Sequence, residues 1–383
     1  MKINKLVSYS IFFLLLMGFS YTFVYAEREN IDINEQIKSD RPQTPKSPFP
    51  YKEEDVHFTN NRGKIRLAGT LTLPNLIPPY PAVILISGSG GHDRDYTLFG
   101  HKPFLVLSDH LTRKGISVLR FDDRGIGNSS GERAMATTKD YAGDVLAGLE
   151  FLKSRRDINS KSIGLIGHSE GGTIASLVTL ESIDVAFIVM IATPGLPGIE
   201  YNYQYEEYTS RALGLSEEKI IEKLLFQEKV FNIILMEKDK RIARYKLKKI
   251  YKEKYPDLPE DRVDKGIARL LSPWFLFNLT YDPGSTLKSI TCPVLAIFGE
   301  KDVQVPPEGN VKAMKSALSD STVEDYLIKI LPKHNHFMQI AKTGSPLEYV
   351  TIEETISPIA LESISNWVLS HSITSKGCDN DEQ

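Results

Sequence analysis

Residues 163–173 read IGLIGHSEGGT and contain a serine with a glycine two positions away on each side. A serine hydroxyl is a poor nucleophile near neutral pH unless a base removes its proton and an acid orients that base. The pattern Gly-x-Ser-x-Gly is short, but here an apolar run precedes it and a helix-forming run follows it. A sharp turn between a strand and a helix raises a serine side chain above a sheet. This placement predicts that Ser169 is a catalytic nucleophile.

Two later segments offer the acid and the base in the chain order that such a turn requires. FGEKDVQVPP follows one apolar run, and Asp302 is the expected acid. Glu300 is the second choice, because it falls directly at the end of the expected strand. LPKHNHFMQ follows the next apolar run and contains two histidines. We expect His336, rather than His334, to be the base.

Attack on a carbonyl also requires hydrogen-bond donors for the oxyanion that forms. The backbone N–H of Glu170, directly after the serine, is the first candidate because it lies at the start of a helix. The second candidate is the N–H of Ser89, in the stretch SGSGGHDRD. Three glycines within residues 87–91 let the backbone approach a ligand closely. As a phosphate loop, the stretch lacks the P-loop lysine and a helix directly after it.

The elements that must position these residues follow an alternation of strands and helices. Two β-rich runs on either side of residues 60–63 predict a hairpin. Apolar runs predict buried strands at 81–87, 117–122, 162–167, 185–192, 292–299 and 322–331. Amphipathic runs predict helices at 104–115, 141–155, 170–182, 308–318 and 354–371. Uninterrupted apolar strands joined by helices predict an α/β fold, with a mostly parallel central sheet flanked by helices on both faces.

The alternation is interrupted at 195–287, where long charged helical stretches replace the strand-like runs. We expect this segment to be a helical lid inserted between late strands of one domain. The two parts of that domain are residues 51–194 and 288–371, and residues 372–383 form a polar tail.

The expected lid contains the aromatic run SPWFLFNLTYDP. Trp274, Phe275 and Phe277 are the residues that we expect to line an acyl pocket. The alternative is that these rings only attach the lid to the body of the domain.

The first residues of the chain have the features of an export signal. Lys2 and Lys5 precede an apolar run, and small residues follow it, so we expect cleavage after Ala26 and export to the periplasm or the cell exterior. A retained membrane anchor is the alternative. Residues 27–50 include RPQTPKSPFP and are expected to form a linker or an extended arm.

The composition is that of an ordinary globular protein, with 41% hydrophobic and 25% charged residues. A net charge of -3 gives no reason to expect nucleic acid or an acidic membrane surface as a partner. The sequence has only two cysteines, Cys292 and Cys378, so the fold must depend on its core rather than on disulfides.

Together, PAVILISGSGGHDRD, FDDRGIGNSSG, IGLIGHSEGG, FGEKDVQVPP and NHFMQ resemble the exported bacterial α/β-hydrolases of the esterase type. These are related to the serine aminopeptidase-like and acyl-CoA thioesterase-like hydrolases. The resemblance covers roughly residues 50–370 and implies a triad of Ser169, Asp302 and His336, since the family's histidine follows an asparagine. Gly91-His92 replaces the Pro-Gln that family members often have, which leaves the donor geometry and any role of His92 open.

The expected function is hydrolysis of a small-molecule ester with a small or medium acyl group, through an acyl-enzyme and without a metal or organic cofactor. A serine aminopeptidase with the same triad is the main alternative, and it would need a lid carboxylate such as Glu200, Glu206 or Glu207 to hold the substrate amine. A thioesterase and a non-catalytic binding protein are further alternatives. The sequence does not indicate an oligomeric state.

Overall fold

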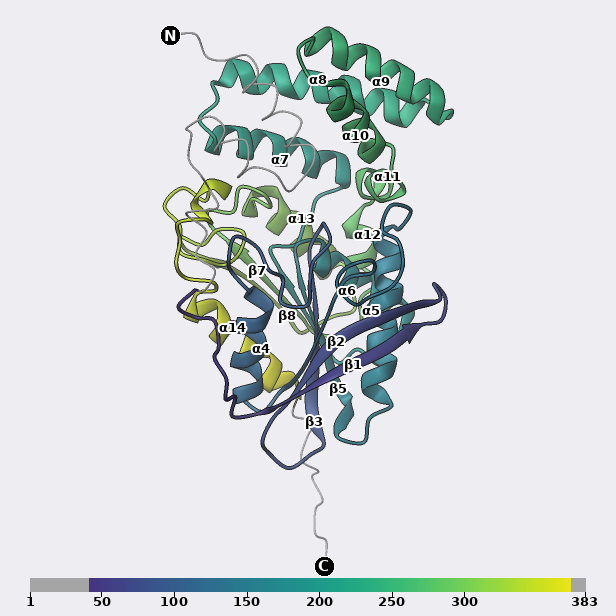
Figure 1. The fold of residues 1–383 in the computed structure, drawn as a ribbon. Helices are drawn as coiled ribbons and strands as arrows, with labels where there is room; N and C mark the ends of the chain where they lie inside the picture. Colours follow the sequence, from purple (N-terminus) through teal and green to yellow (C-terminus); the bar gives the residue numbers. More distant parts are fainter. Residues whose placement is uncertain (1–40, 373–383) are drawn as a thin grey trace, which may run out of the picture.

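The computed structural model describes residues 41–372, and a sheet of eight strands forms its centre (Figure 1). The strands are β1 (Lys52–Asn60), β2 (Ile65–Leu73), β3 (Tyr80–Ile86), β4 (Ser117–Phe121), β5 (Ile158–His168), β6 (Ile188–Ile191), β7 (Val294–Gly299) and β8 (Tyr326–Leu331). Their spatial order is β1-β2-β4-β3-β5-β6-β7-β8. The pairs β1–β2 and β2–β4 are antiparallel, and every pair from β4 to β8 is parallel. The predicted mostly parallel sheet is confirmed.

The parallel strands are apolar because both of their faces are covered. Strand β7 is buried along its whole length. Four of the predicted strands are longer than the observed ones, and β6 and β8 differ most. Strand β6 is limited to Ile188–Ile191, the residues that pair with both β5 and β7. Strand β8 begins at Tyr326 because its partner β7 begins opposite it, at Val294.

Helices cover both faces of the sheet, as predicted (Figure 1). The first face carries α5 (Thr138–Lys153), α6 (Glu170–Glu181) and α13 (Pro307–Ser319), and the second carries α4 (Pro103–Arg113) and α14 (Pro358–Ser372). Leu149 of α5 and Leu111 of α4 are completely buried against the two faces. Each such leucine contributes about 1.5–3 kcal/mol to stability. These two cores hold the strand ends in place.

Six helices form the segment between β6 and β7, which caps the carboxyl ends of the parallel strands (Figure 1). They are α7 (Gly198–Ala212), α8 (Glu217–Met236), α9 (Lys240–Lys254), α10 (Glu260–Leu270), α11 (Pro273–Thr280) and α12 (Pro283–Leu287). We call this segment the cap. It has a hydrophobic core of its own, in which Val230, Leu247 and Ile267 are fully buried. The Ser216, Asp239 and Ser272 side chains accept hydrogen bonds from the first turns of α8, α9 and α11.

The described part of the segment before β1 lies against the body of the domain. The buried Arg41 guanidinium donates hydrogen bonds to the carbonyls of Phe99, Val350 and Ile352 at 2.8–3.0 Å. Gln43 donates to the carbonyl of Ile356 at 2.7 Å. The expected signal peptide, residues 27–40 and residues 373–383 lie outside the described residues.

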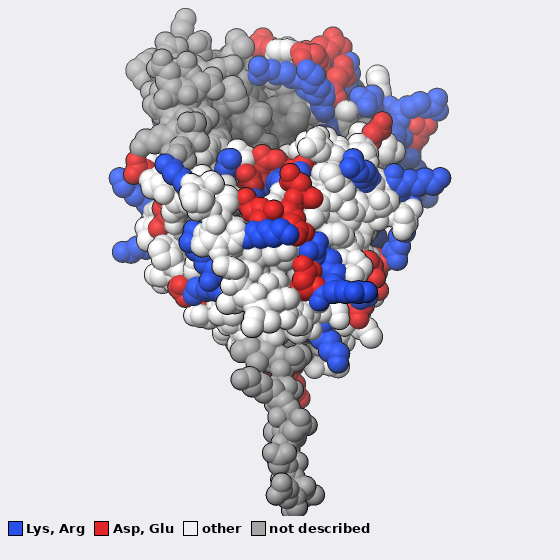
Figure 2. All heavy atoms as spheres, turned by 60° about the horizontal axis from the view of Figure 1, so that its bottom comes forward, with Lys and Arg blue, Asp and Glu red and all other residues white. Residues whose placement is uncertain are grey.

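The surface is mixed in charge. Figure 2 shows acidic and basic side chains interspersed over the face turned toward the viewer, without a large area of one sign. Within residues 41–372, no helix combines the length and the apolar character that crossing a bilayer requires.

Candidate active site

Ser169 lies in a tight turn between the end of β5 and the start of α6. Its backbone has φ 56° and ψ -121°, a strained conformation for a residue with a side chain. A Cβ atom at Gly167 would collide with the backbone of Gly171, and one at Gly171 would collide with the carbonyl of Ile86. Both glycines of the motif are therefore required by packing. The turn presents the Ser169 side chain to the cavity beneath the cap.

His336 and Asp302 come together beside this turn. The Nδ1 atom of His336 lies 2.8 Å from Oδ2 of Asp302, and both residues are buried. The other carboxylate oxygen accepts hydrogen bonds from the backbone N–H groups of Gln304 and Val305, each at 2.8 Å. Asp302 therefore has a fixed orientation and holds the His336 proton on Nδ1. The Nε2 atom of His336 has no hydrogen-bond partner among residues 41–372, and the ring lines the same cavity as Ser169.

The two rival residues lie elsewhere. His334 uses both ring nitrogens in the structure, with Nδ1 2.7 Å from the Pro332 carbonyl and Nε2 2.6 Å from the Ser357 hydroxyl. Glu300 accepts a hydrogen bond from the Lys333 N–H at 2.7 Å. Neither residue lines the cavity. They fix the loop after β8, which places His336 on the wall of the cavity that Ser169 also lines.

The glycine-rich loop after β3 reaches the serine as expected. Ser89 lines the cavity, and its backbone N–H has no hydrogen-bond partner among the described residues. A Cβ on Gly88 would lie 3.1 Å from the Cβ of Ser169, so the loop backbone approaches the serine closely. Glu170 begins α6, and its N–H belongs to the free first turn of that helix. The two predicted oxyanion donors therefore lie at one end of the cavity.

The carboxylate of Asp123, a half-buried residue, anchors this loop. It accepts hydrogen bonds from the Ser87 hydroxyl at 2.8 Å and from the His92 N–H at 2.9 Å. Burial raises the pKa of Asp123 to about 7. Sequence reasoning did not select Asp123, because its contacts join two loops that are distant along the chain.

His92 supports the peptide of Ser89. Its Nε2 atom lies 3.1 Å from the Ser89 carbonyl oxygen, which can only accept a hydrogen bond. Burial lowers the pKa of His92 to about 4, so the ring is neutral near pH 7 and Nε2 carries its proton. His92, which stands where family members often have Gln, thus helps to fix the loop through its hydrogen bond to the Ser89 carbonyl.

His168 and Tyr96 connect the loop to the histidine. The Gly88 N–H donates to the Tyr96 hydroxyl at 3.3 Å, and that hydroxyl lies 3.0 Å from Nδ1 of His168. Nε2 of His168 lies 2.9 Å from the carbonyl oxygen of His336. Burial, followed by the nearby His336, lowers the pKa of His168 well below its usual value. The neutral ring therefore accepts from Tyr96 and donates to His336.

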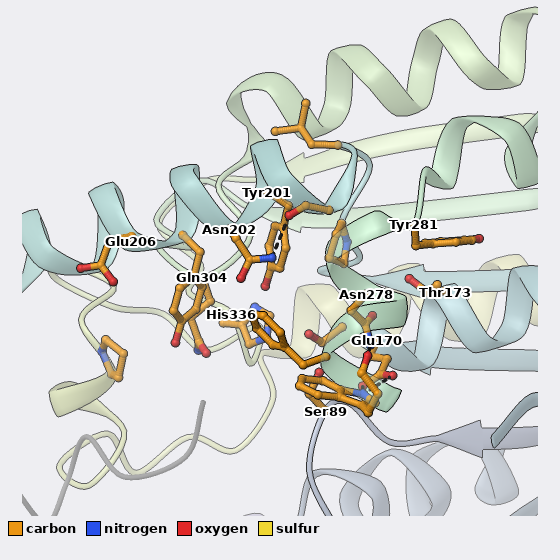
Figure 3. A pocket seen from close by; sticks show the side chains of 18 of the residues that line it. Ser89, Glu170, Thr173, Tyr201, Asn202, Glu206, Asn278, Tyr281, Gln304 and His336 are labelled. Carbon is orange, nitrogen blue, oxygen red and sulfur yellow. Dashed lines mark hydrogen bonds between the residues drawn. The ribbon is translucent and has the colours of Figure 1, made fainter. Parts of the chain in front are cut away.

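The side chain of Glu170 joins the body to the cap. One carboxylate oxygen accepts hydrogen bonds from the Thr138 hydroxyl at 2.6 Å and from the Trp274 indole N–H at 2.8 Å. The Asn278 amide donates to Thr138 at 3.1 Å. Figure 3 shows Glu170 and Asn278 side by side at this end of the cavity. The buried carboxylate is thus fully hydrogen-bonded to neutral donors.

Of the three lid aromatics, two line the cavity and one does not. Trp274 and Phe275 contribute to its wall. Phe277 was expected there, and this expectation is corrected, since it is not among the lining residues. Its ring stacks on Tyr281 at 5.2 Å and lies under the Lys139 ammonium. The helical turn of α11 directs it toward the body rather than into the cavity.

The cavity has a volume of about 160 Å³, and mostly aromatic and apolar residues line it. Figure 3 shows Tyr201 and Asn202 projecting from α7 toward His336. Glu206 also lines the cavity, but its buried carboxylate forms an ion pair with Lys223 and accepts a hydrogen bond from Ser210 at 2.8 Å. Within residues 41–372, no three His, Cys, Asp or Glu side chains gather closely enough to hold a metal ion.

The other two carboxylates considered for binding a substrate amine, Glu200 and Glu207, do not line the cavity. Glu207 pairs with Arg211 at 3.0 Å on the surface. Glu200 is not among the lining residues. Of the three carboxylates considered for binding a substrate amine, only Glu206 reaches the site, and a lysine already neutralises its charge.

Comparisons with known proteins agree with this geometry. The sequence matches the family model described as serine aminopeptidase, S33, over residues 78–336. Esterase EstD of Thermotoga maritima is 28% identical over 323 residues, which cover 84% of this chain and 68% of that protein.

Two solved structures illustrate the similarity of fold. The esterase Pf2001 of Pyrococcus furiosus superposes with a TM-score of 0.52 at 17% identity, covering 87% of this chain and 96% of that one. The α/β hydrolase GrgF of Penicillium sp. sh18 gives 0.52 at 19% identity, with 84% and 98% covered. The family match extends over more than half of the chain and includes the predicted serine, acid and histidine. The chain therefore has the α/β-hydrolase fold and belongs to the serine aminopeptidase S33 family.

Proposed function

We propose that the chain hydrolyses carboxylic esters of small or medium acyl groups, with Ser169 as the nucleophile. The observation that carries this proposal is the 2.8 Å hydrogen bond between Asp302 and His336, on the same cavity as the strained serine turn. Asp302 leaves Nε2 of His336 as the unprotonated nitrogen, which is the state that a general base requires.

The reaction follows from these positions. Ser169 Oγ forms a bond with the ester carbonyl carbon while Nε2 of His336 takes the hydroxyl proton. The N–H groups of Ser89 and Glu170 stabilise the oxyanion, and each such donor contributes about 10²–10³ in rate. The bond to the alcohol oxygen then breaks, and His336 returns its proton to the leaving alcohol. Water attacks the acyl-enzyme with His336 again as the base, which releases the carboxylic acid and restores Ser169.

Two observations favour an ester over an aminoacyl substrate. The carboxylate that reaches the cavity from the cap, Glu206, is already paired with Lys223, so it offers little net negative charge to a substrate amine. The protein EstD, to which this chain is similar, is named an esterase.

The size of the cavity supports a small or medium acyl group. A volume of about 160 Å³ is close to that of an apolar cavity of about 150 Å³ that holds one benzene molecule. Phe275 and Phe337 supply apolar wall for an alkyl chain.

The test compares the wild type with Ser169→Ala on p-nitrophenyl butyrate and on an aminoacyl p-nitroanilide. We expect ester hydrolysis to fall by at least about 10⁴-fold in the variant, and labelling by a fluorophosphonate probe to disappear. Faster cleavage of the anilide than of the ester would instead identify a peptidase. Full esterase activity in the variant would reject Ser169 as the nucleophile.

We also propose that the protein is exported after cleavage following Ala26. Three features of the sequence support this proposal: the lysines at the start, the apolar run after them and the small residues that lead up to Ala26. The intact mass of the protein recovered from cell fractions tests it, because a retained anchor would leave the first 26 residues in place.

A further inference from the structure

One charged side chain on the wall of the cavity, that of Arg269, has no hydrogen-bond or ion-pair partner among residues 41–372. The ionisable side chains on that wall include those of Glu170, Glu206, Arg269 and His336. Glu206 is neutralised by Lys223, and Glu170 is hydrogen-bonded to Trp274 and Thr138. The guanidinium of Arg269 has no such partner among the described residues.

Arg269 lies near the end of α10, where its guanidinium carbon is 4.9 Å from the centre of the Trp274 ring. This contact fixes the plane of the guanidinium but uses none of its N–H groups. Its Nε atom is buried and has no hydrogen-bond partner. Among the described residues, no carboxylate lies within ion-pair distance of Arg269, and no carbonyl or hydroxyl accepts from its side chain.

The surroundings of Arg269 neutralise only part of its charge. Burial lowers the pKa of Arg269, while the charge of Glu170 raises it from a distance. Glu170 therefore offsets part of the positive charge, but its oxygens are already occupied by Trp274 and Thr138. The buried Nε–H lies out of reach of solvent and is left without an acceptor, which destabilises it. The Nη1 and Nη2 groups, which are not among the buried atoms, thus remain available at the wall of the cavity in which an ester must bind.

We propose that Arg269 binds a carboxylate of the substrate, so that the preferred substrate is an ester that also carries a free carboxylate group. A planar guanidinium held by an aromatic ring presents two parallel N–H groups, which match the two oxygens of a carboxylate. This inference rests on the proposed ester hydrolysis and adds the class of substrate to it. The carboxylate belongs either to the acyl part or to the alcohol part of the ester, and matched substrates separate the two.

The first experiment uses two pairs of esters of equal size. The p-nitrophenyl monoester of glutaric acid is compared with p-nitrophenyl valerate, and 4-acetoxybenzoate is compared with p-tolyl acetate. In each pair, one member has a carboxylate where the other has a methyl group. The ratio of the two kcat/KM values within a pair measures the preference for the anion. It does not depend on the fraction of the enzyme that is active, because that fraction cancels.

We expect Arg269→Met to lower this ratio at least about tenfold in one of the two pairs, while the neutral esters change by less than about threefold. Arg269→Lys keeps the positive charge but lacks the two parallel N–H groups of a guanidinium. It should therefore lose part of the preference for the anionic ester. Lys265→Met removes a positive charge from the exposed side of the same helix and should leave the ratio unchanged. An unchanged ratio in Arg269→Met, or an equal loss for both members of each pair, would overturn the proposal.

A second measurement separates this inference from the proposed function. Monomethyl glutarate and 4-acetoxybenzoate, with methyl valerate and p-tolyl acetate as their neutral partners, are titrated into Ser169→Ala and into the double variant with Arg269→Met. Binding of one of the two anions that weakens at least about tenfold in the double variant supports the anion site, even if esterase activity is absent. Equal binding of both anions in the two proteins contradicts it, even if Ser169 proves to be the nucleophile.

Discussion

Nε2 of His168 lies 2.9 Å from the backbone carbonyl of His336, which links the residue before the proposed nucleophile to the residue expected to be its base. Because Tyr96 connects His168 to Gly88 as well, one buried imidazole holds the oxyanion loop and the histidine loop together. Correct alignment of the site therefore depends on side chains that touch no substrate.

Replacement of His168 by Phe tests this link. The Tyr96 hydroxyl and the His336 carbonyl would lose a partner in a buried environment, at a cost of about 1–3 kcal/mol. We expect a lower Tm and a fall in kcat that exceeds the change in KM. His168→Gln keeps a donor and an acceptor and should recover part of kcat. Equal kcat values for the Phe variant and the wild type would contradict a positioning role.

Asp302→Asn leaves the size of the side chain unchanged but removes the carboxylate that accepts from His336 Nδ1. The amide can donate to that nitrogen and would stabilise the wrong tautomer of the ring. We expect kcat on p-nitrophenyl butyrate to fall by about 10³–10⁴-fold, with little change in the far-ultraviolet circular dichroism spectrum. Glu300→Gln changes a carboxylate that accepts from the Lys333 N–H and does not line the cavity, so it should change kcat by much less.

Several parts of this site follow from the sequence because they are local. The strand before Ser169, the helix after it and the two glycines specify the turn, and a collision-free backbone requires both glycines. Asp302 and His336 were located by their order after late strands. His336 and His334 are two positions apart, and the structure separates them because Pro332 and Ser357 occupy the ring nitrogens of His334.

Other parts depend on contacts between distant segments, which periodicity does not reveal. Arg269 and Asp123 belong to helical and loop segments whose neighbours are set by the packing of the cap and of the loop after β3. Phe277 was assigned to the cavity because its aromatic run is apolar on every side. The face of α11 that meets the body is fixed only by tertiary packing.

Asp123 should make the stability depend on pH. Its folded pKa of about 7 lies above the unfolded value of about 3.9, so the folded protein binds the additional proton between these values. The contribution of this group is complete below about pH 4 and is lost as the pH rises through about 7. Urea unfolding of the wild type and of Asp123→Asn at pH 5 and pH 8 measures this. We expect the wild type to lose stability relative to the variant at pH 8, and a pH-independent difference would contradict the assignment.

The two tryptophans allow a matched test of the contact between cap and body. The indole N–H of Trp274 donates to the buried Glu170 carboxylate, whereas the indole N–H of Trp367 is buried without a hydrogen-bond partner. Replacement by Phe removes the indole N–H at both positions, but only Trp274→Phe deprives a carboxylate of a donor. Hydrogen bonds to charged groups contribute about 1.5–3 kcal/mol.

We therefore expect Trp274→Phe to raise KM for p-nitrophenyl butyrate and to lower the free energy of unfolding by about 2 kcal/mol more than Trp367→Phe does. In Trp274→Phe the Glu170 carboxylate loses the indole donor. Adding Glu170→Gln removes the negative charge of that side chain and should recover part of the lost stability, because a neutral amide is less costly to bury. Equal losses for the two tryptophan variants, or no recovery in the double variant, would show that Trp274 acts through packing alone. Recovery of stability without recovery of KM would place the indole ring itself, stacked under Arg269, in contact with the substrate.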